Sequence, residues 1–311
     1  MLTSPSKIHR TRDANSCADF LLSVAEARVR VRAALHQSGT CTPVVADVAS
    51  HKAVADVVKR TPFTLHGVAF SGADSAGAPK IRHVWRAWPG ASPILGSEKL
   101  DRNGLRRRIE ESTRDGLSHL WRIDTPLSIA REHLAAQGVA EEWNAIAAWM
   151  ASFPSARDWR RAMRTTDRKE LRRACDRARS TPLAPTNLRL FKQTWALIAE
   201  VAHPLASKGV RIEPCTGDNN ARVAICESNT ASTLDTAEIP STGYRGAGNA
   251  AVSRRESILT WLRTRGVGIG AELAQLAVDD TEGDILDALI LMSDPVCTVT
   301  PDVAAFESWI Y

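Results

Sequence analysis

The sequence has little of what marks a membrane-spanning, secreted or zinc-ribbon protein. No uninterrupted apolar run approaches the roughly 18–20 residues that a bilayer-spanning helix needs, and the chain starts with polar residues where a secretory signal places its apolar stretch. The six cysteines contain no CxxC pair, so neither a zinc ribbon nor a compact disulfide framework is indicated. These absences predict a cytoplasmic protein with free thiols and no membrane partner.

Several catalytic motifs are also missing. The chain has no GxSxG elbow, no HExxH pair and no GxxxxGK[ST] loop, so the serine hydrolase, zincin and P-loop classes find no support. Its 311 residues are 44% hydrophobic and 24% charged, which suffices for one large or two ordinary cores and excludes disorder as the main state. Tyrosine and phenylalanine are few, whereas tryptophan occurs nine times, mostly on helical apolar faces that predict packing. Examples are Trp143, Trp149, Trp195 and Trp261.

The net charge of +5 is concentrated in one segment. Between Arg157 and Lys192 lie twelve basic and four acidic residues, a local net charge of +8, so the rest of the chain is net acidic. Most of the basic residues are arginine, whose planar guanidinium suits phosphate oxygens better than an ammonium does. One interpretation is therefore a nucleic-acid contact made by Arg160, Arg161, Arg164, Arg168, Arg172 and Arg173. The alternative is a solvated helix face whose arginines pair with acids three or four residues away.

The apolar patterns predict an α/β protein. Strands are expected at 65–70, 79–88, 118–124 and 221–228, and helices at 102–114, 253–266 and 282–292. The first two strands should form a hairpin. Residues 1–60 are expected to form a mainly helical extension, and 61–311 one domain with a helical, arginine-rich insertion at about 130–210.

Four carboxylates are candidates for a metal site. Asp284 and Asp287 are three residues apart at the start of an expected helix, which puts both on one face, although acids there also simply stabilise the helix dipole. Asp124 and Glu227 lie at strand ends, where an open α/β sheet presents its ligand crevice. Converging carboxylates need a cation, and all-oxygen ligands suit Mg²⁺ or Mn²⁺. Such ions stabilise the oxygens of a phosphoryl displacement, so phosphodiester hydrolysis is the predicted chemistry.

Five phrases resemble the DUF429 family of predicted nucleases. They are GVAFSGADSAG (67–77), RIDTPLS (122–128), ESNTASTL (227–234), GYRG (243–246) and EGDILDAL (282–289), in that order along about 65–292. The resemblance implies an RNase H-like mixed sheet flanked by helices. It also implies a metal-dependent nuclease whose acids fall on position 69, Asp124, Glu227, Asp284 and Asp287.

Position 69 departs from that family pattern. Ala69 stands where the resemblance implies a strand-one aspartate, so metal binding and hydrolysis should be lost or impaired. Three explanations compete: a substitution made to trap an inactive form, a natural pseudo-enzyme, or replacement by Asp74 in the following turn. Ser71, Gly72 and Gly77 keep the family's small-residue turn, which favours the first.

Other functions remain open at this point. The expected function is metal-dependent cleavage of DNA or RNA, with Arg245 of GYRG either holding a phosphate or lying in an ordinary exposed loop. A first alternative is a nucleic-acid-binding or regulatory protein that has lost the chemistry. A second is a phosphotransferase of the sugar-kinase and actin type, which needs two phosphate loops where only SGADSAG is found.

Overall fold

The computed structural model describes residues 62–163, 170–179, 181, 183–216, 221–293, 295 and 300–311. The chain divides into two units, Met1–Thr61 and Pro62–Tyr311. The expected helical extension at 1–60 lies outside the described residues, as do Arg164 and Arg168. Among the residues described, no helix combines the length and the apolar character needed to cross a membrane.

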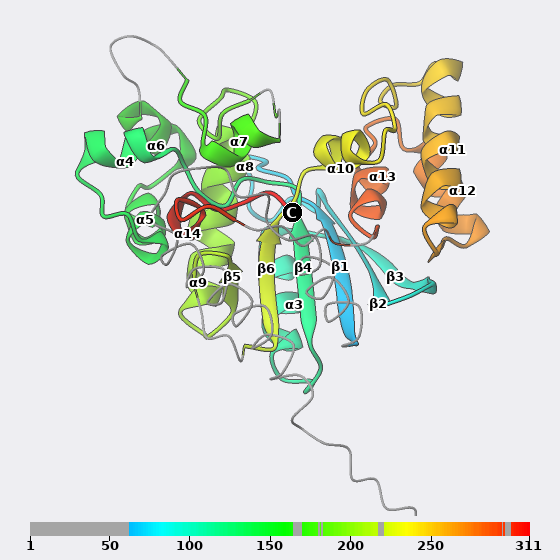
Figure 1. The fold of residues 1–311 in the computed structure, drawn as a ribbon, viewed down its shortest axis with the longest axis horizontal. Coiled ribbons are helices and arrows are strands. Elements are labelled where there is room, and N and C mark those ends of the chain that lie inside the picture. Colours follow the sequence, from blue (N-terminus) through cyan, green and yellow to red (C-terminus); the bar gives the residue numbers. More distant parts are fainter. Residues whose placement is uncertain are drawn as a thin grey trace, which may run out of the picture. The chain divides into compact units, whose positions relative to one another are not determined.

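The second unit is built on a seven-stranded mixed sheet (Figure 1) with the order β5-β6-β4-β1-β2-β3-β7. The strands are β1 (Phe63–Ala69), β2 (Ile81–Trp88), β3 (Ser92–Leu100), β4 (His119–Ile123), β5 (Arg211–Glu213), β6 (Val223–Glu227) and β7 (Val267–Gly268). β1, β2 and β3 form an antiparallel meander, and β4, β6 and β5 continue the sheet parallel to β1. The predicted hairpin and the strands near 118–124 and 221–228 are confirmed.

Strand β3 is a third member of the meander that the sequence pattern did not predict. Its side chains are half-buried or exposed, as expected at the margin of a sheet, and Pro93 and Gly96 interrupt its apolar pattern. Gly96 is needed where it stands, because a Cβ there would lie 2.1 Å from the ring of Trp85 on the neighbouring strand. The glycine therefore gives the Trp85 ring room to lie across β3.

Helices lie between β3 and β4, between β4 and β5, and after β6. The helix after the meander is α3 (Arg102–Ser112), and those between β4 and β5 are α4 (Arg131–Gln137), α5 (Trp143–Ala151), α6 (Ala156–Ala162), α7 (Ala174–Ala178), α8 (Phe191–Trp195), the π-helix η1 (Ala196–Ala202) and α9 (His203–Ala206). After β6 come α10 (Thr230–Thr236), α11 (Asn249–Thr264), α12 (Ala271–Asp279), α13 (Asp284–Ile290) and α14 (Ala304–Glu307). The helices near 102–114, 253–266 and 282–292 are confirmed, and the segment of the expected insertion is helical between β4 and β5.

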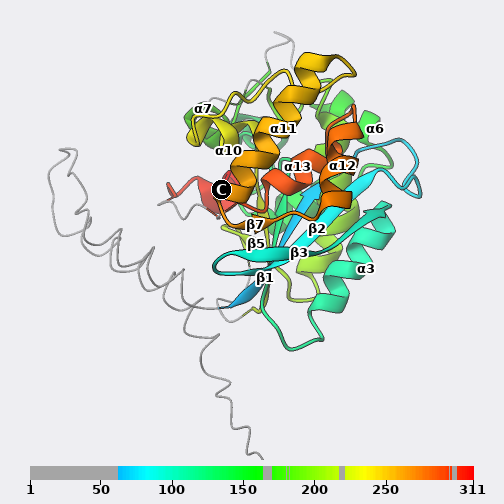
Figure 2. The ribbon, with the colours of Figure 1, turned by 90° about the vertical axis from the view of Figure 1, so that its right-hand side faces the viewer.

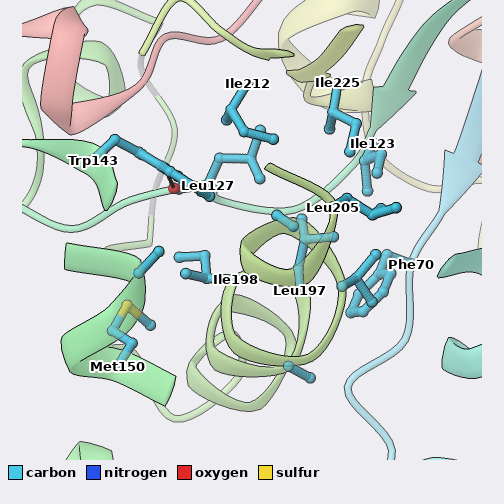
Figure 3. Packing of buried hydrophobic residues seen from close by; sticks show 14 of the residues in the cluster. Phe70, Ile123, Leu127, Trp143, Met150, Leu197, Ile198, Leu205, Ile212 and Ile225 are labelled. Atoms are coloured by element: carbon cyan, nitrogen blue, oxygen red, sulfur yellow. Dashed lines mark hydrogen bonds between the residues drawn. The ribbon is translucent and has the colours of Figure 1, made fainter. Parts of the chain in front are cut away.

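The main core lies on the α3 side of the sheet. Sheet residues such as Val68 and Ile123 pack there with Leu105 of α3 and Leu197 of η1. Figure 3 shows the η1 side chains between the sheet residues and α5, where Trp143 Nε1 donates to Leu127 O at 2.7 Å. The packing role predicted for the tryptophans is confirmed for Trp143, which is 1% exposed.

The opposite face is covered closely by α13, so that α3 and α13 lie on opposite sides of the sheet (Figure 2). Gly67 of β1 faces α13, because a Cβ at this residue would lie 2.3 Å from Ala288 O. Side chains alternate along a strand, so Ala69 points to the same face as Gly67 while Val68 points to the core. The missing side chain at Gly67 thus lets α13 lie directly against the end of β1.

Candidate acidic site at the carboxyl ends of β1 and β4

Asp124 lies beside Ala69 at the carboxyl edge of the sheet. β4 runs parallel to β1 with Ile123 opposite Val68, and Asp124 N donates to Val68 O at 3.0 Å. The side chain of Asp124 follows the alternation of the strands and faces the α13 side. Thr230 Oγ1, at the start of α10, donates to Asp124 Oδ2 at 3.2 Å. Asp124 is therefore held at the strand end where the sequence predicted it.

Asp287 comes to the same place from the first turn of α13. It is 3% exposed, and Gly283, with φ of 78°, leads the chain into the helix. Tyr244 Oη donates to Asp287 Oδ1 at 2.7 Å, and Arg245 Nη2 donates to Asp287 Oδ2 at 2.6 Å. Both oxygens of this carboxylate are fixed by neighbouring residues of one loop.

The charges of Asp124 and Asp287 act on one another. Burial, and next the charge of Asp287, raises the pKa of Asp124 well above its ordinary value, although Thr230 opposes the shift. Burial likewise raises the pKa of Asp287, against the opposing effect of Arg245. A raised pKa in both acids means that the site holds negative charge at a free-energy cost that a cation would relieve.

Asp284 and Ala69 border this pair of acids. The side chain of Asp284 is 44% exposed and its Oδ1 lies 3.8 Å from Arg245 Nη1. Burial, and next the charge of Asp280, raises the pKa of Asp284. Ala69 is 7% exposed, and by strand alternation its Cβ points to the face that carries Asp124. Four of the five predicted positions thus lie around one end of the sheet, with no carboxylate at position 69.

Glu227, the fifth predicted position, does not join these acids. It ends β6 opposite Ile123, so its side chain points to the core face, opposite to that of Asp124. Its two carboxylate oxygens accept hydrogen bonds from Arg173 Nη2 at 2.6 Å and Nη1 at 2.7 Å, and Leu127 N donates to the same carboxylate at 2.8 Å. The expectation that Glu227 is a metal ligand of the Asp124 site is therefore corrected: it anchors the insertion.

Cys175 and Asp176 lie close enough to Glu227 for the three groups to hold a metal ion in principle. The guanidinium of Arg173 already bridges the two carboxylates, with Nη2 donating to Asp176 Oδ1 at 2.8 Å. Burial also raises the pKa of the Cys175 thiol well above its ordinary value, so the thiolate that a metal requires is disfavoured. The arrangement is a buried ion-pair cluster.

The arginines predicted to contact nucleic acid differ in how far their side chains are exposed and in which groups they already bind. Arg173 is 0% exposed in the cluster just described, so its assignment as a backbone contact is corrected. Arg160 donates to Thr186 O and lies over the ring of Phe191, and Arg172 donates to two backbone carbonyls. Arg161 is 75% exposed and pairs with Asp158 at 2.9 Å. Of the described members of this set, Arg161 has the side chain most open to a partner.

Asp74, the alternative to an acid at position 69, lies in an exposed turn. Lys192 Nζ is 2.6 Å from its Oδ1, and this hydrogen bond lowers the pKa of Asp74. Asp74 is thus held in a surface ion pair with Lys192 of the insertion.

Two residues that the sequence reasoning did not assign complete the site. Tyr244 precedes Arg245 in GYRG, and Thr230 lies three residues after Glu227 in ESNT. Their place in phrases already singled out could have indicated them, but their hydrogen-bond partners depend on the fold. No family model, no curated protein and no solved structure matches the chain.

Proposed function

We propose that residues 62–311 form an RNase H-like domain whose acidic site belongs to metal-dependent phosphodiester hydrolysis, with the activity lost or impaired because Ala69 replaces a carboxylate. The observation that carries this proposal is the meeting of Asp124 and Asp287, 163 positions apart in the sequence, beside position 69. The antiparallel meander continued by parallel strands, and the resemblance to the DUF429 nucleases, support the same interpretation.

The residues present fit one divalent ion and not two. Mg²⁺ is commonly held by one or two protein carboxylates together with phosphate oxygens of the substrate. Asp124 and Asp287 can provide the two carboxylates. A second ion would need a bridging carboxylate that Ala69 does not offer, and Glu227 is bound to Arg173. When bound, a divalent ion supplies Lewis-acid stabilisation of the charge that develops on phosphate oxygens.

The protein's own contribution is to place and balance the carboxylates. Thr230 orients Asp124, and Tyr244 orients Asp287. Arg245 neutralises part of the negative charge, while 54% of its side chain remains exposed. A guanidinium so placed can also contact a substrate phosphate that enters the site. Arg161 offers a further contact on the insertion, which should weaken as salt concentration rises.

The decisive experiment restores the missing acid. Ala69→Asp should raise Mn²⁺-dependent cleavage of single-stranded and double-stranded DNA and RNA, by on the order of 10²-fold if it completes the charge-stabilising set. Ala69→Asn is the matched control, since it has the same size without the charge. Adding Asp124→Asn to Ala69→Asp should remove the gain. Equal activity in all these variants would overturn the assignment.

A second candidate, a binding protein that has lost the chemistry, is favoured by one contact. Arg245 Nη2 lies 2.6 Å from Asp287 Oδ2, so the protein supplies an internal cation where the nuclease would use a metal. If the protein only binds nucleic acid, its binding should be unchanged by a metal chelator and weakened by Arg161→Glu. Under it, Ala69→Asp brings no cleavage.

A further inference from the structure

Three histidines on adjacent strands form a continuous chain of contacts within the sheet. His83 Nε2 of β2 lies 2.9 Å from His66 Nδ1 of β1, and His66 Nε2 lies 2.9 Å from His119 Nδ1 of β4. Glu98 Oε1 is 2.9 Å from His83 Nδ1, and Asp115 Oδ2 is 2.9 Å from His119 Nε2. Every ring nitrogen is used, and a carboxylate closes each end. These five residues are called the histidine chain below.

The three rings are buried among aromatic side chains. His66, His83 and His119 are 6%, 1% and 7% exposed. His66 stacks on Trp121 with ring centroids 3.8 Å apart, and His83 stacks on Trp85 at 4.8 Å. Water has little access to the middle of the chain, so the rings must satisfy one another.

Among the described residues, few other charged groups face the histidine chain. Arg108 of α3 binds Glu98 through two nitrogens, each at 3.0 Å, and contacts Glu111 at 3.3 Å. Asp115 follows α3, and its Oδ1 also accepts from Leu117 N at 2.8 Å. Glu98 and Asp115 are thus the described carboxylates in contact with the rings. Arg108 binds Glu98, which in turn contacts His83.

Counting protons shows what the chain must contain. Each of the four contacts needs one hydrogen, and the carboxylates at both ends can only accept. Neutral imidazoles carry one N–H each, so three neutral rings supply three hydrogens and leave one contact without a donor. An unfilled contact would set two lone pairs against each other in a buried place, which is costly. One additional proton, present as an imidazolium, fills all four contacts.

We propose that the histidine chain is a proton-binding site that holds one excess proton near neutral pH and thereby joins β2, β1 and β4. The charge belongs on His119, next to Asp115, whose side chain is 42% exposed. Burial first, and then the charges of neighbouring histidines, lowers the pKa of His66. Burial also lowers the pKa of His83. His66 and His83 therefore stay neutral, each with its hydrogen on Nδ1.

A single substitution should remove the need for the excess proton. In Asp115→Asn, the amide oxygen can keep the bond from Leu117 N while the amide nitrogen takes the place of Oδ2 and donates to His119 Nε2. Three neutral rings then fill all the contacts. The substitution therefore removes the need for the excess proton without removing a hydrogen bond.

Nitrogen-15 NMR of the histidine-labelled full chain tests this at pH 7.5, where an ordinary histidine, with a pKa of about 6.5, is mostly neutral. Four protonated ring nitrogens are expected on the three rings, with His119 carrying two, and Asp115→Asn should reduce the number to three. Glu111→Gln is the matched control, since it removes a nearby charge that touches no ring, and should keep four. His66→Gln, His83→Gln and His119→Gln assign the resonances.

Either of two results would overturn the proposal. The first is three neutral rings in the unsubstituted chain at pH 7.5. The second is a fourth protonated nitrogen that persists in Asp115→Asn. Because the first measurement needs no variant, the excess proton is tested even if a substitution prevents folding.

Discussion

At the scale of single residues, the acids of the described structure are of two kinds. Some carboxylates pair closely with an arginine, and others have no basic side chain in close contact. Glu227 and Asp176 share the buried guanidinium of Arg173, whereas Asp124 relies on a threonine and on the more distant Arg245. Acids of the first kind stabilise the fold through their partner. Asp124, of the second kind, keeps a raised pKa, which is typical of functional positions, and Asp287 keeps one although Arg245 pairs with it.

Removing Arg173 should therefore be severe. Arg173→Met leaves Glu227 and Asp176 charged, buried and unpaired, and breaking such a pair costs about 3–5 kcal/mol in the free energy of unfolding. Urea denaturation measures this loss. Arg161→Met is the control, because its ion pair with Asp158 is exposed and such pairs contribute about 0–1 kcal/mol. Equal effects of the two substitutions would contradict the role given to Arg173.

At the scale of elements, the sequence predicts most of the sheet, because β1, β2, β4 and β6 are apolar runs or alternate cleanly. It also places Asp124 and Asp287 correctly at element ends. It cannot tell which face a residue at a strand end occupies, since a shift of one residue exchanges the faces. Glu227 ends its strand as predicted, but in register with Ile123 and thus on the core side.

The spacing between β1 and α13 depends on Gly67. A methyl group there would lie 2.3 Å from Ala288 O and 2.7 Å from Met292 Cε, so Gly67→Ala must push the helix outward. Overpacking of this kind costs typically about 1–3 kcal/mol in the free energy of unfolding. The shift should also draw Asp287 away from Asp124. In Gly77→Ala the nearest atom is 4.0 Å away, so this control should stay within about 0.5 kcal/mol. Thermal unfolding of both variants checks the difference.

At the scale of the whole molecule, the pKa shifts of the buried histidines and of the two aspartates should make stability depend on pH with opposite signs. His66 and His83 have lowered pKa values, so at these two residues the unfolded chain takes up protons first, and their contribution to stability falls as pH drops below about 6.5. Asp124 and Asp287 have raised pKa values, so these two carboxyl groups stay protonated to a higher pH in the folded chain than in the unfolded chain. Their contribution to stability is present below about pH 3.9 and is lost as pH rises through the folded values.

Neutralising the half-buried Asp124 should consequently stabilise the protein at neutral pH. Asp124→Asn keeps an acceptor for Thr230 and removes the repulsion with Asp287, so the free energy of unfolding should rise by at least about 1 kcal/mol at pH 7. The gain should shrink towards zero as pH approaches 4, because the aspartate is then protonated as well. Asp235→Asn, on the exposed side of α10, should change little at either pH. Denaturant unfolding of the three proteins at both pH values measures these differences, and a stability loss in Asp124→Asn at pH 7 would mean that its charge is already balanced within the fold.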